Sequence, residues 1–371
     1  MQSAKGIVEG ILHHADIHIN GARPWDMVIH NEQLYERVLS VGSLGLGEAY
    51  MDKWWECEQL DEFFSRILRA QLDKAVKGDV RLLLHIAGAV ILNQQRKTKA
   101  FNIGEHHYDI GNDLYQAMLD KRLTYTCGYW KNATTLDEAQ EAKLDLVCKK
   151  IGLKAGQKVL DIGCGWGSFA QFAAEKYGAQ VVGVTVSKEQ IELGRTLCRG
   201  LPVELRLQDY REVKEPFDHV VSLGMIEHVG YKNYRTYMEV VHRVLKDEGL
   251  FLLHTIGGLR SVKTTEPWIA KYIFPNSMLP SIQQLSHAFQ GLFVMEDWHS
   301  FGHYYDQTLM TWFHNFDAHW NELKQQYDDR FYRMWKYYLL CCAGSFRARK
   351  NQLWQIVLSK HGVPGGYESL R

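Results

Sequence analysis

The chain has 371 residues, of which 46% are hydrophobic, so it is long enough for two domains or one large domain with a substantial core. Lys and Arg together number 43, as do Asp and Glu, and this zero net charge excludes a generally polybasic nucleic-acid binder. The seven cysteines include no CxxC pair, so the sequence predicts neither a disulfide framework nor a metal site and is typical of a reduced cytoplasm.

The N-terminal residues 1–20 lack the apolar core and the small-residue cleavage site of a signal peptide. The most apolar stretch, Val80–Leu92, contains Arg81 and His85 and is shorter than the ~20 apolar residues that a spanning helix needs. We therefore expect a protein that is soluble or that touches membranes only from outside.

A small, mostly helical domain is expected before the polar basic stretch 94–100, which we interpret as a domain boundary. Its apolar face at helical spacing is formed by Leu60, Phe63, Phe64, Ile67 and Leu68. The segment 42–55 (GSLGLGEAYMDKWW) combines glycines with aromatic residues. One interpretation, which the physics favours, is a turn followed by a core helix. The other is a surface that meets a lipid interface, where Trp and Tyr are favoured.

Short apolar strands alternate with helical segments after that boundary. The expected strands are 157–162, 180–185, 203–207, 217–223 and 249–254, with later ones near 293–298 and 353–358. Helices are expected over 169–177 and 234–245, and Ser187 is expected to cap another. This alternation predicts an α/β fold, a doubly wound and mostly parallel sheet with helices on both faces.

The strongest motif is VLDIGCGWG, residues 159–167. Asp161 ends the first strand, and Gly163, Gly165 and Gly167 form the turn into a helix, where the backbone bends sharply and a ligand approaches it closely. The spacing differs from the dinucleotide fingerprint, which has two residues between its second and third glycines.

A GxGxG loop after an acidic residue resembles motif I of the S-adenosylmethionine-dependent methyltransferases. The resemblance implies that the loop holds the methionine part of the cofactor, that Asp209 receives the adenine amino group, and that Tyr210 presents an aromatic ring to the adenine, with Gln208 a weaker candidate. The family's second strand usually ends in an acidic residue that binds the ribose. Thr185 stands there in this chain, so Thr185 and Gln190 are expected to bind the ribose differently.

Segments along almost the whole chain closely resemble the cyclopropane-fatty-acyl-phospholipid synthases. They are GSLGLGEAYMDKWWE, EHHYDIGNDLY (105–115), YTCGYW (125–130), GVTVSKEQ, GMIEHVGYKNY (224–234), LLHTIG (252–257), PWIAKYIFPN (267–276) and CAGSFRARKNQLWQ (342–355). The resemblance implies transfer of a methylene group from S-adenosylmethionine to a cis double bond of an unsaturated phospholipid acyl chain, which forms a cyclopropane ring. The related mycolic-acid enzymes generally lack the N-terminal domain.

The same resemblance implies a bound bicarbonate ion as the base. The matching positions are Cys127, Glu227, His254, Ile256, through its backbone N–H, and Tyr305. Glu227 and His254 lie just past the ends of two predicted strands, at the edge where the cofactor also binds. Tyr125 and Thr126 resemble the family's cofactor-contacting pair.

Cys164, inside the glycine loop, is expected to be structural. Cys342 matches a cysteine that is sometimes designated the active-site residue of the family, but methyl transfer to an alkene needs no thiol, so we expect a packing residue near the site. Arg347 and Arg349 either pair with a lipid phosphate or, as we favour, form surface salt bridges.

We therefore expect a helical lipid-binding domain over 1–95 and a catalytic domain over 96–371, with an acyl-pocket insertion at about 258–345. The enzyme is expected to be a cytoplasmic homodimer that acts peripherally at the inner face of the membrane, with no nucleic-acid partner. Two rival hypotheses are a methyltransferase of the same fold that forms no ring and an inactive lipid-binding protein.

Overall fold

The computed structural model describes residues 3–70 and 110–371. This part of the chain forms two compact units. The first contains the described residues up to Ile110, together with Glu266–Pro275 and Phe316–Lys350, and the second contains Gly111–Thr265, Asn276–Asn315 and Asn351–Arg371. The first unit thus includes two segments that the sequence analysis assigned to the catalytic domain.

The predicted domain boundary at 95, the basic stretch 94–100 and the apolar stretch Val80–Leu92 lie outside the described residues. Among the described residues, no helix combines the length and the apolar character that crossing a membrane requires.

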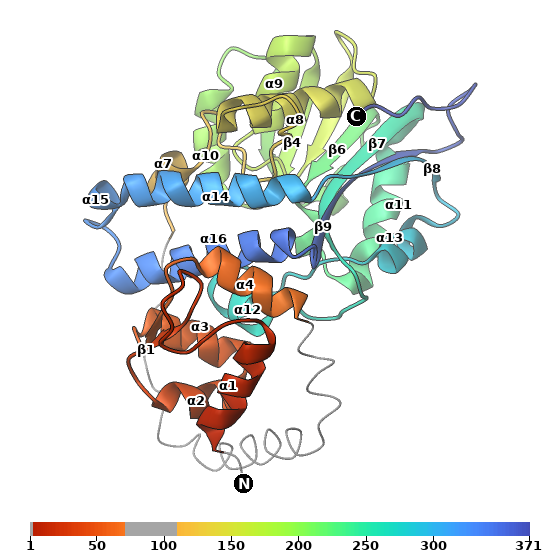
Figure 1. The fold of residues 1–371 in the computed structure, drawn as a ribbon. Helices are drawn as coiled ribbons and strands as arrows, with labels where there is room; N and C mark the ends of the chain where they lie inside the picture. Colours follow the sequence, from red (N-terminus) through yellow and green to blue (C-terminus); the bar gives the residue numbers. More distant parts are fainter. Residues whose placement is uncertain (1–2, 71–109) are drawn as a thin grey trace. The chain divides into compact units, whose positions relative to one another are not determined.

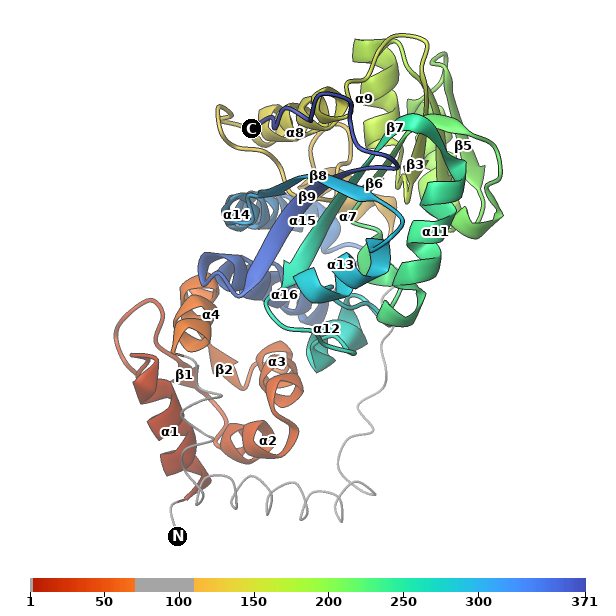
Figure 2. The same cartoon turned by 90° about the vertical axis from the view of Figure 1, so that its right-hand side faces the viewer.

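The second unit is built on a seven-stranded sheet in the order β5-β4-β3-β6-β7-β9-β8. Its strands are β3 (Lys158–Ile162), β4 (Gln180–Thr185), β5 (Val203–Leu207), β6 (Phe217–Leu223), β7 (Leu245–Gly258), β8 (Val294–Ser300) and β9 (Asn351–Ser359). The first five run parallel, whereas β9 lies antiparallel between β7 and β8 (Figure 2). The predicted mostly parallel sheet, including its two late strands, is confirmed.

Helices cover both faces of this sheet, as predicted (Figure 1). One apolar core joins the sheet to α8 (Leu136–Lys150), α9 (Ser168–Tyr177) and α10 (Lys188–Leu197). The other joins it to α11 (Tyr234–Val244) and α13 (Ile282–Phe289). Ser187 caps α10, because its hydroxyl accepts a hydrogen bond from the Gln190 backbone N–H.

Five further helical elements complete the described part of the second unit. They are α7 (Asn112–Met118), the one-turn helices η1 (Tyr210–Glu212), η2 (Ile226–His228) and η3 (Tyr231–Asn233), and the first part of α14 (His303–Ala318).

The first unit is mostly helical. Its elements are α1 (Ala4–His14), β1 (Val28–Ile29), α2 (Gln33–Val41), α3 (Ser43–Met51), β2 (Trp55–Glu56), α4 (Leu60–Arg69), α12 (Pro267–Tyr272), α15 (Trp320–Leu323) and α16 (Asp329–Arg347). The predicted apolar face of α4 packs against α16, and the two helices lie side by side in Figure 1. A Cβ added at Gly344 of α16 would lie 2.5 Å from the Asp61 carbonyl oxygen, so the glycine permits this close approach.

The segment 42–55 forms a turn followed by a core helix, which was the first of the two interpretations. Gly42 turns the chain with a φ of 68°, and α3 begins at the next residue. Tyr50, Met51 and Trp55 are at most 2% exposed. These side chains belong to the interior of the first unit, so they do not form a lipid-facing surface.

Candidate active site

The glycine loop follows β3 and leads directly into α9. Gly163, Gly165 and Gly167 have φ angles of 81°, 55° and 84°, a left-handed conformation that strongly favours glycine. A Cβ added at Gly163 would lie 2.6 Å from Met225 Cγ, whereas no atom lies within 4 Å of one added at Gly165. The loop is thus open on the side of Gly165, where a cofactor can approach its backbone.

The ends of β4 and β5 bring together the predicted ribose residues. The Thr185 hydroxyl accepts a hydrogen bond from the Ser187 backbone N–H at 3.2 Å and lies 3.4 Å from Gln190 Oε1. The Gln208 N–H donates to the Thr185 carbonyl oxygen. Hydrogen-bonding groups therefore stand at the strand end where the family usually has a carboxylate.

Asp209 and Tyr210 follow β5, as predicted. Both Asp209 carboxylate oxygens accept hydrogen bonds from the Arg211 guanidinium, which lowers the pKa of that carboxyl below its usual value. The Tyr210 ring meets the Tyr237 ring edge-on at 5.2 Å. The sequence analysis did not anticipate Arg211 as a partner for the carboxylate that it assigned to the adenine.

The Tyr125–Cys127 segment is held by α8. Gln140 Nε2 donates to the Thr126 carbonyl oxygen, and Lys143 Nζ donates to the Thr126 hydroxyl, both at 2.7 Å. Cys127 is fully buried, which raises the pKa of its thiol and keeps it protonated, and its Sγ lies 3.8 Å from Thr308 Oγ1. Cys127 therefore presents no thiolate nucleophile.

Glu227 follows the end of β6, as predicted, whereas His254 does not follow the end of its strand, because it lies opposite Leu223 and β7 continues to Gly258. Glu227 lies in η2, which follows β6, and His254 lies on β7. The Ile256 N–H donates to Glu227 Oε1 at 2.8 Å. The sequence analysis assigned this N–H to an anion, whereas the structure pairs it with the carboxylate.

Gln355 of β9 lies opposite His254, and its side-chain Nε2 is 3.3 Å from His254 Nδ1. Burial holds the pKa of His254 well below its ordinary value, so the imidazole is neutral. When the Gln355 amide donates to Nδ1, the ring proton lies on Nε2. His254 then offers one N–H donor.

Three atoms of this cluster are buried and have no hydrogen-bond partner among the described residues: Glu227 Oε2, His254 Nε2 and Gln355 Oε1. Buried polar groups are normally paired, so this set points to a small polar ligand. Burial also raises the pKa of Glu227 to about 7. Near neutral pH its carboxyl group is therefore divided between a protonated form that donates and an ionised form that accepts.

Tyr305 of α14 approaches Tyr125 through a shared neighbour. The Trp312 ring lies 5.9 Å from the Tyr305 ring and 5.2 Å from the Tyr125 ring. These rings form an aromatic wall beside the Tyr125–Cys127 segment, of the kind that can stabilise a cation in a desolvated site.

Four further candidates remain, namely Cys164, Cys342, Arg347 and Arg349. Cys164 packs in the core between the sheet and α9, as expected of a structural residue. Cys342 lies on α16 and belongs to the first unit, as do Arg347 and Arg349, whereas the other candidates belong to the second.

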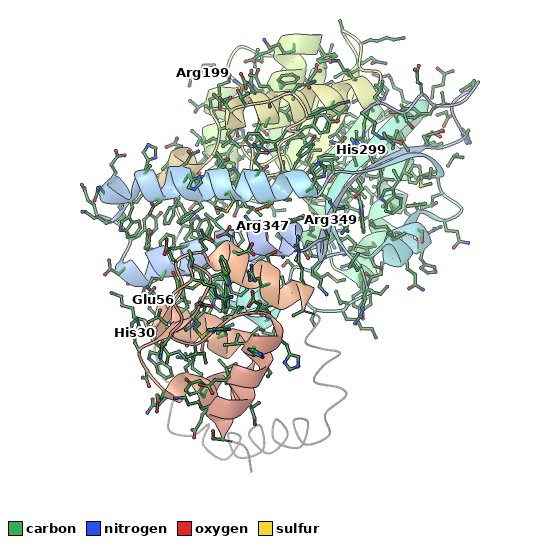
Figure 3. The ribbon with its side chains drawn as sticks, viewed as in Figure 1. His30, Glu56, Arg199, His299, Arg347 and Arg349 are labelled. Atoms are coloured by element: carbon green, nitrogen blue, oxygen red, sulfur yellow. The ribbon has the colours of Figure 1, made fainter. Side chains whose placement is uncertain are left out.

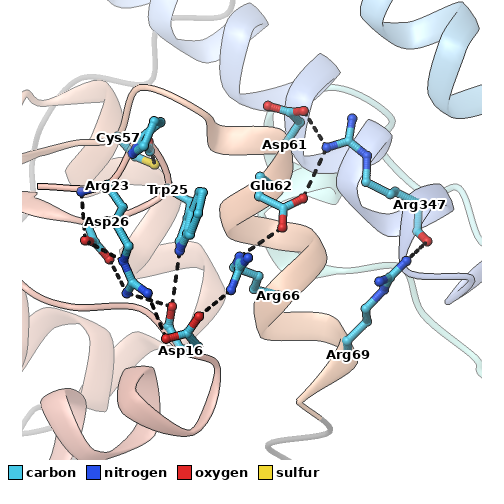
Figure 4. A network of polar contacts seen from close by, with 11 residues as sticks. Asp16, Arg23, Trp25, Asp26, Cys57, Asp61, Glu62, Arg66, Arg69 and Arg347 are labelled. Carbon is cyan, nitrogen blue, oxygen red and sulfur yellow. Dashed lines mark hydrogen bonds and ion pairs between the residues drawn. The ribbon is translucent and has the colours of Figure 1, made fainter. Parts of the chain in front are cut away.

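Arg347 forms ion pairs with Asp61 at 2.6 Å and Glu62 at 3.5 Å (Figure 4), which fits the salt-bridge interpretation. Arg349 lies just beyond the end of α16 (Figure 3).

The sequence analysis missed Gln140, Lys143 and Gln355. A signal for two of them was present, because Gln140 and Lys143 share a helix face with Leu136, Ala139 and Val147, which are buried. Polar residues on an apolar face indicate an internal hydrogen-bond network. Gln355 had no comparable signal, because only strand pairing brings it opposite His254.

Comparisons with known proteins show which proteins the chain is similar to. The mycolic acid cyclopropane synthetase family matches residues 94–356. The chain is 52% identical to the cyclopropane-fatty-acyl-phospholipid synthase of Escherichia coli K12 over 98% of this chain and 95% of that protein. It is 34% identical to cyclopropane mycolic acid synthase 2 of Mycobacterium leprae over 69% of this chain and 92% of that protein.

Two solved structures extend the likeness to three dimensions. The cyclopropane synthase MmaA2 from Mycobacterium tuberculosis matches with a TM-score of 0.65 and 31% identity over 69% of this chain and 96% of that chain. The mycolic acid cyclopropane synthase CmaA1, solved with S-adenosylhomocysteine (SAH), matches with a TM-score of 0.64 and 33% identity over 69% and 96%.

Proposed function

Because the chain belongs to the mycolic acid cyclopropane synthetase family and is an S-adenosylmethionine-dependent methyltransferase, we propose that it forms cyclopropane rings in the unsaturated acyl chains of membrane phospholipids. The observation that carries this proposal is 52% identity, along 98% of the chain, to a relative with that activity in its name. Glu227 and His254 supply the polar cluster that the chemistry needs.

The reaction makes three demands on the protein. The acyl double bond attacks the methyl group of the sulfonium, so that a C–C bond forms and the C–S bond breaks to release SAH. The resulting carbocation loses a proton from the added methyl group and closes to the ring. The site must therefore align the double bond with the methyl group, tolerate positive charge and accept a proton.

S-adenosylmethionine supplies the methyl group when bound, and bicarbonate supplies the base. We assign the cofactor to the glycine loop and to Thr185, Gln190, Gln208, Asp209 and Tyr210. We also propose that the aromatic wall of Tyr125, Trp312 and Tyr305 stabilises the positive charge that develops in the reaction.

We place the bicarbonate ion at His254 and Glu227. His254 Nε2–H and a protonated Glu227 both donate to an anion, and their unpaired buried atoms support this assignment. The ionised form of the Glu227 carboxyl, which is also present near pH 7, does not donate to the anion and can instead take up a proton. Gln355 holds the His254 ring in the donor tautomer.

The same proposal places the enzyme at the membrane surface. A phospholipid double bond lies inside the bilayer, so the protein must meet the lipid at the cytoplasmic face to reach it. Because the chain resembles the phospholipid enzymes, we also propose that it forms a homodimer.

Product analysis tests the proposal. The purified protein is incubated with methyl-labelled S-adenosylmethionine and unsaturated phospholipid vesicles, and the isolated acyl chains are analysed by mass spectrometry and proton NMR. The expected product has gained one CH2, has lost its vinylic protons and shows ring methylene protons. A product of the same mass that keeps its vinylic protons would favour methylation without ring closure, and no product would favour an inactive lipid-binding protein.

The bicarbonate assignment is tested in the same assay. Degassed, bicarbonate-free buffer should lower turnover, and added bicarbonate should restore it at constant pH. Turnover that is independent of bicarbonate would remove the ion from the proposal.

A further inference from the structure

Lys143 is a charged side chain in the interior of the second unit. It is 0% exposed and lies on the face of α8 that also buries Ala139, Leu144 and Val147. Burying an ammonium group costs several kcal/mol unless nearby groups compensate for the lost water. A lysine at this position therefore indicates a specific role for its charge.

Thr126 is the direct partner of that charge. Lys143 Nζ donates to the Thr126 hydroxyl, and Gln140, one helical turn earlier, donates to the Thr126 carbonyl oxygen, both at 2.7 Å. Gln140 and Lys143, which share one helix face, thus hold the carbonyl oxygen and the hydroxyl of Thr126, a residue of the proposed cofactor-binding segment.

The electrostatic surroundings of Lys143 come from several elements. The acidic groups are Asp161 at the end of β3 and Asp120 after α7, and the other titratable groups are Cys127 and His254. Burial raises the pKa of Asp161 to about 7, and the positive charge of Lys143 opposes this rise. Burial lowers the pKa of Lys143 itself to about 8, against the attraction of the two aspartates.

We propose that Lys143 is a positioning residue for the cofactor, whose ammonium group fixes Thr126 through its hydroxyl. Asp161, which precedes the glycine loop, is attracted to the same buried cation. The inference rests on the proposed function only through its cofactor site and makes no use of the lipid.

Lys150 provides a matched control on the same helix. It lies seven residues after Lys143, is 1% exposed, and its pKa is also lowered by burial to about 8. Its ammonium nitrogen lies 3.1 Å from Nδ1 of His299 (labelled in Figure 3) and 3.6 Å from Asp297, and neither belongs to the cofactor site. Removing either lysine leaves comparable buried space, so general damage to α8 affects both variants.

The test compares SAH affinity in the full-length wild type, Lys143→Met and Lys150→Met by calorimetry between pH 6 and 9. We expect Lys143→Met to bind SAH at least about tenfold more weakly and Lys150→Met to stay within about twofold of the wild type. Wild-type affinity should fall as pH rises through about 8, where Lys143 loses its proton, and this fall should be absent from Lys143→Met. Unchanged affinity in Lys143→Met, or equal losses in both variants, would overturn the proposal.

Two milder variants keep the test decisive if Lys143→Met does not fold. Lys143→Arg retains the charge and should recover part of the affinity. Thr126→Val removes the hydroxyl that Lys143 contacts and should weaken SAH binding several-fold. Wild-type SAH affinity in folded Thr126→Val would contradict the proposal. Because SAH binding is measured without lipid, these results are independent of whether the product contains a ring.

Discussion

Glu227 and His254 are both buried, and burial shifts their pKa values in opposite directions. Burial raises the pKa of Glu227 to about 7 and holds that of His254 well below its ordinary value, so each group favours its neutral form. The Ile256 N–H and the Gln355 amide fix their orientations. The result is a polar site with little fixed charge of its own.

Glu227→Gln should separate chemistry from cofactor binding. The amide keeps the size of the side chain and can still accept from the Ile256 N–H, but it cannot take up a proton. We expect turnover on unsaturated vesicles to fall by about 10² or more, which is typical of a lost acid–base group, with SAH affinity within about twofold of the wild type. Normal turnover in this variant would remove Glu227 from the mechanism.

Two alanine substitutions can distinguish loss of space for the cofactor from strain in the backbone of the glycine loop. Gly165→Ala should weaken SAH binding at least about tenfold, because the methyl group enters the open side of the loop, and should cost about 1–2 kcal/mol of stability from its left-handed backbone. Gly156→Ala is the matched control, because Gly156 also has a positive φ and open space but precedes β3 at its other end.

Calorimetry with SAH and thermal unfolding would measure both effects. Equal SAH affinities in the two alanine variants would show that the open side of Gly165 is not cofactor space.

The sequence predicted much of this site because strand ends and spaced glycines are local signals. Asp161 and His254 lie at the ends of recognisable apolar runs, Glu227 follows another, and parallel strands end at a common edge. The partners Arg211 and Gln355 could not be predicted in the same way. Whether one side chain meets another depends on rotamers and on pairing between distant strands, which no local pattern encodes.

At the scale of elements, the strands were predicted more closely than the packing of the helices. β4, β5 and β6 have the predicted bounds: β4 and β6 are short, mostly apolar runs, and β5 alternates apolar with charged residues, which is the pattern of a half-buried strand. The apolar face of α4 was also predicted, but its partner was not. That partner, α16, lies far along the chain and buries an apolar face of its own.

Gly344→Ala should test the α4–α16 contact. The added methyl group meets the Asp61 carbonyl oxygen at 2.5 Å, so the helices must separate, and we expect a loss of about 1–3 kcal/mol in unfolding free energy. Gly10→Ala in α1, where no atom lies within 4 Å, should instead stabilise its helix by about 0.5–1 kcal/mol. Denaturant unfolding would compare the two, and a neutral Gly344→Ala would show that the helices do not approach this closely.

At the scale of the whole molecule, the first unit is discontinuous in sequence. Tyr337 of α16 packs against Tyr50 and Phe64, whose rings lie 5.6 and 5.1 Å away, and against Trp268 of α12 at 4.6 Å. The N-terminal helices therefore share one core with later segments. The sequence analysis placed a boundary near residue 95 because composition changes there, but composition does not reveal which distant helices return to an earlier core.

Deletion of residues 1–95 should therefore expose apolar surface. The truncated chain keeps α12 and α16 but loses the helices on which they pack, so we expect poor solubility and increased binding of a hydrophobic dye at equal protein concentration. The matched control is full-length protein with Gly10→Ala, which changes α1 without uncovering α16.

If the truncated protein instead stays soluble and melts like the full-length chain, the shared core contributes little. Flotation with unsaturated vesicles would then test whether the first unit binds lipid, and an SAH titration would show whether the cofactor site remains intact.

The discontinuous first unit also constrains how the chain is made. Arg69 and Arg347, which share a hydrogen bond at the ends of α4 and α16, are separated by 278 positions. At about 5–20 residues per second, the ribosome needs about 14–56 seconds to synthesise that interval. Until α16 has been synthesised, the apolar face of α4 lacks the partner that covers it in the folded chain and remains available for other contacts.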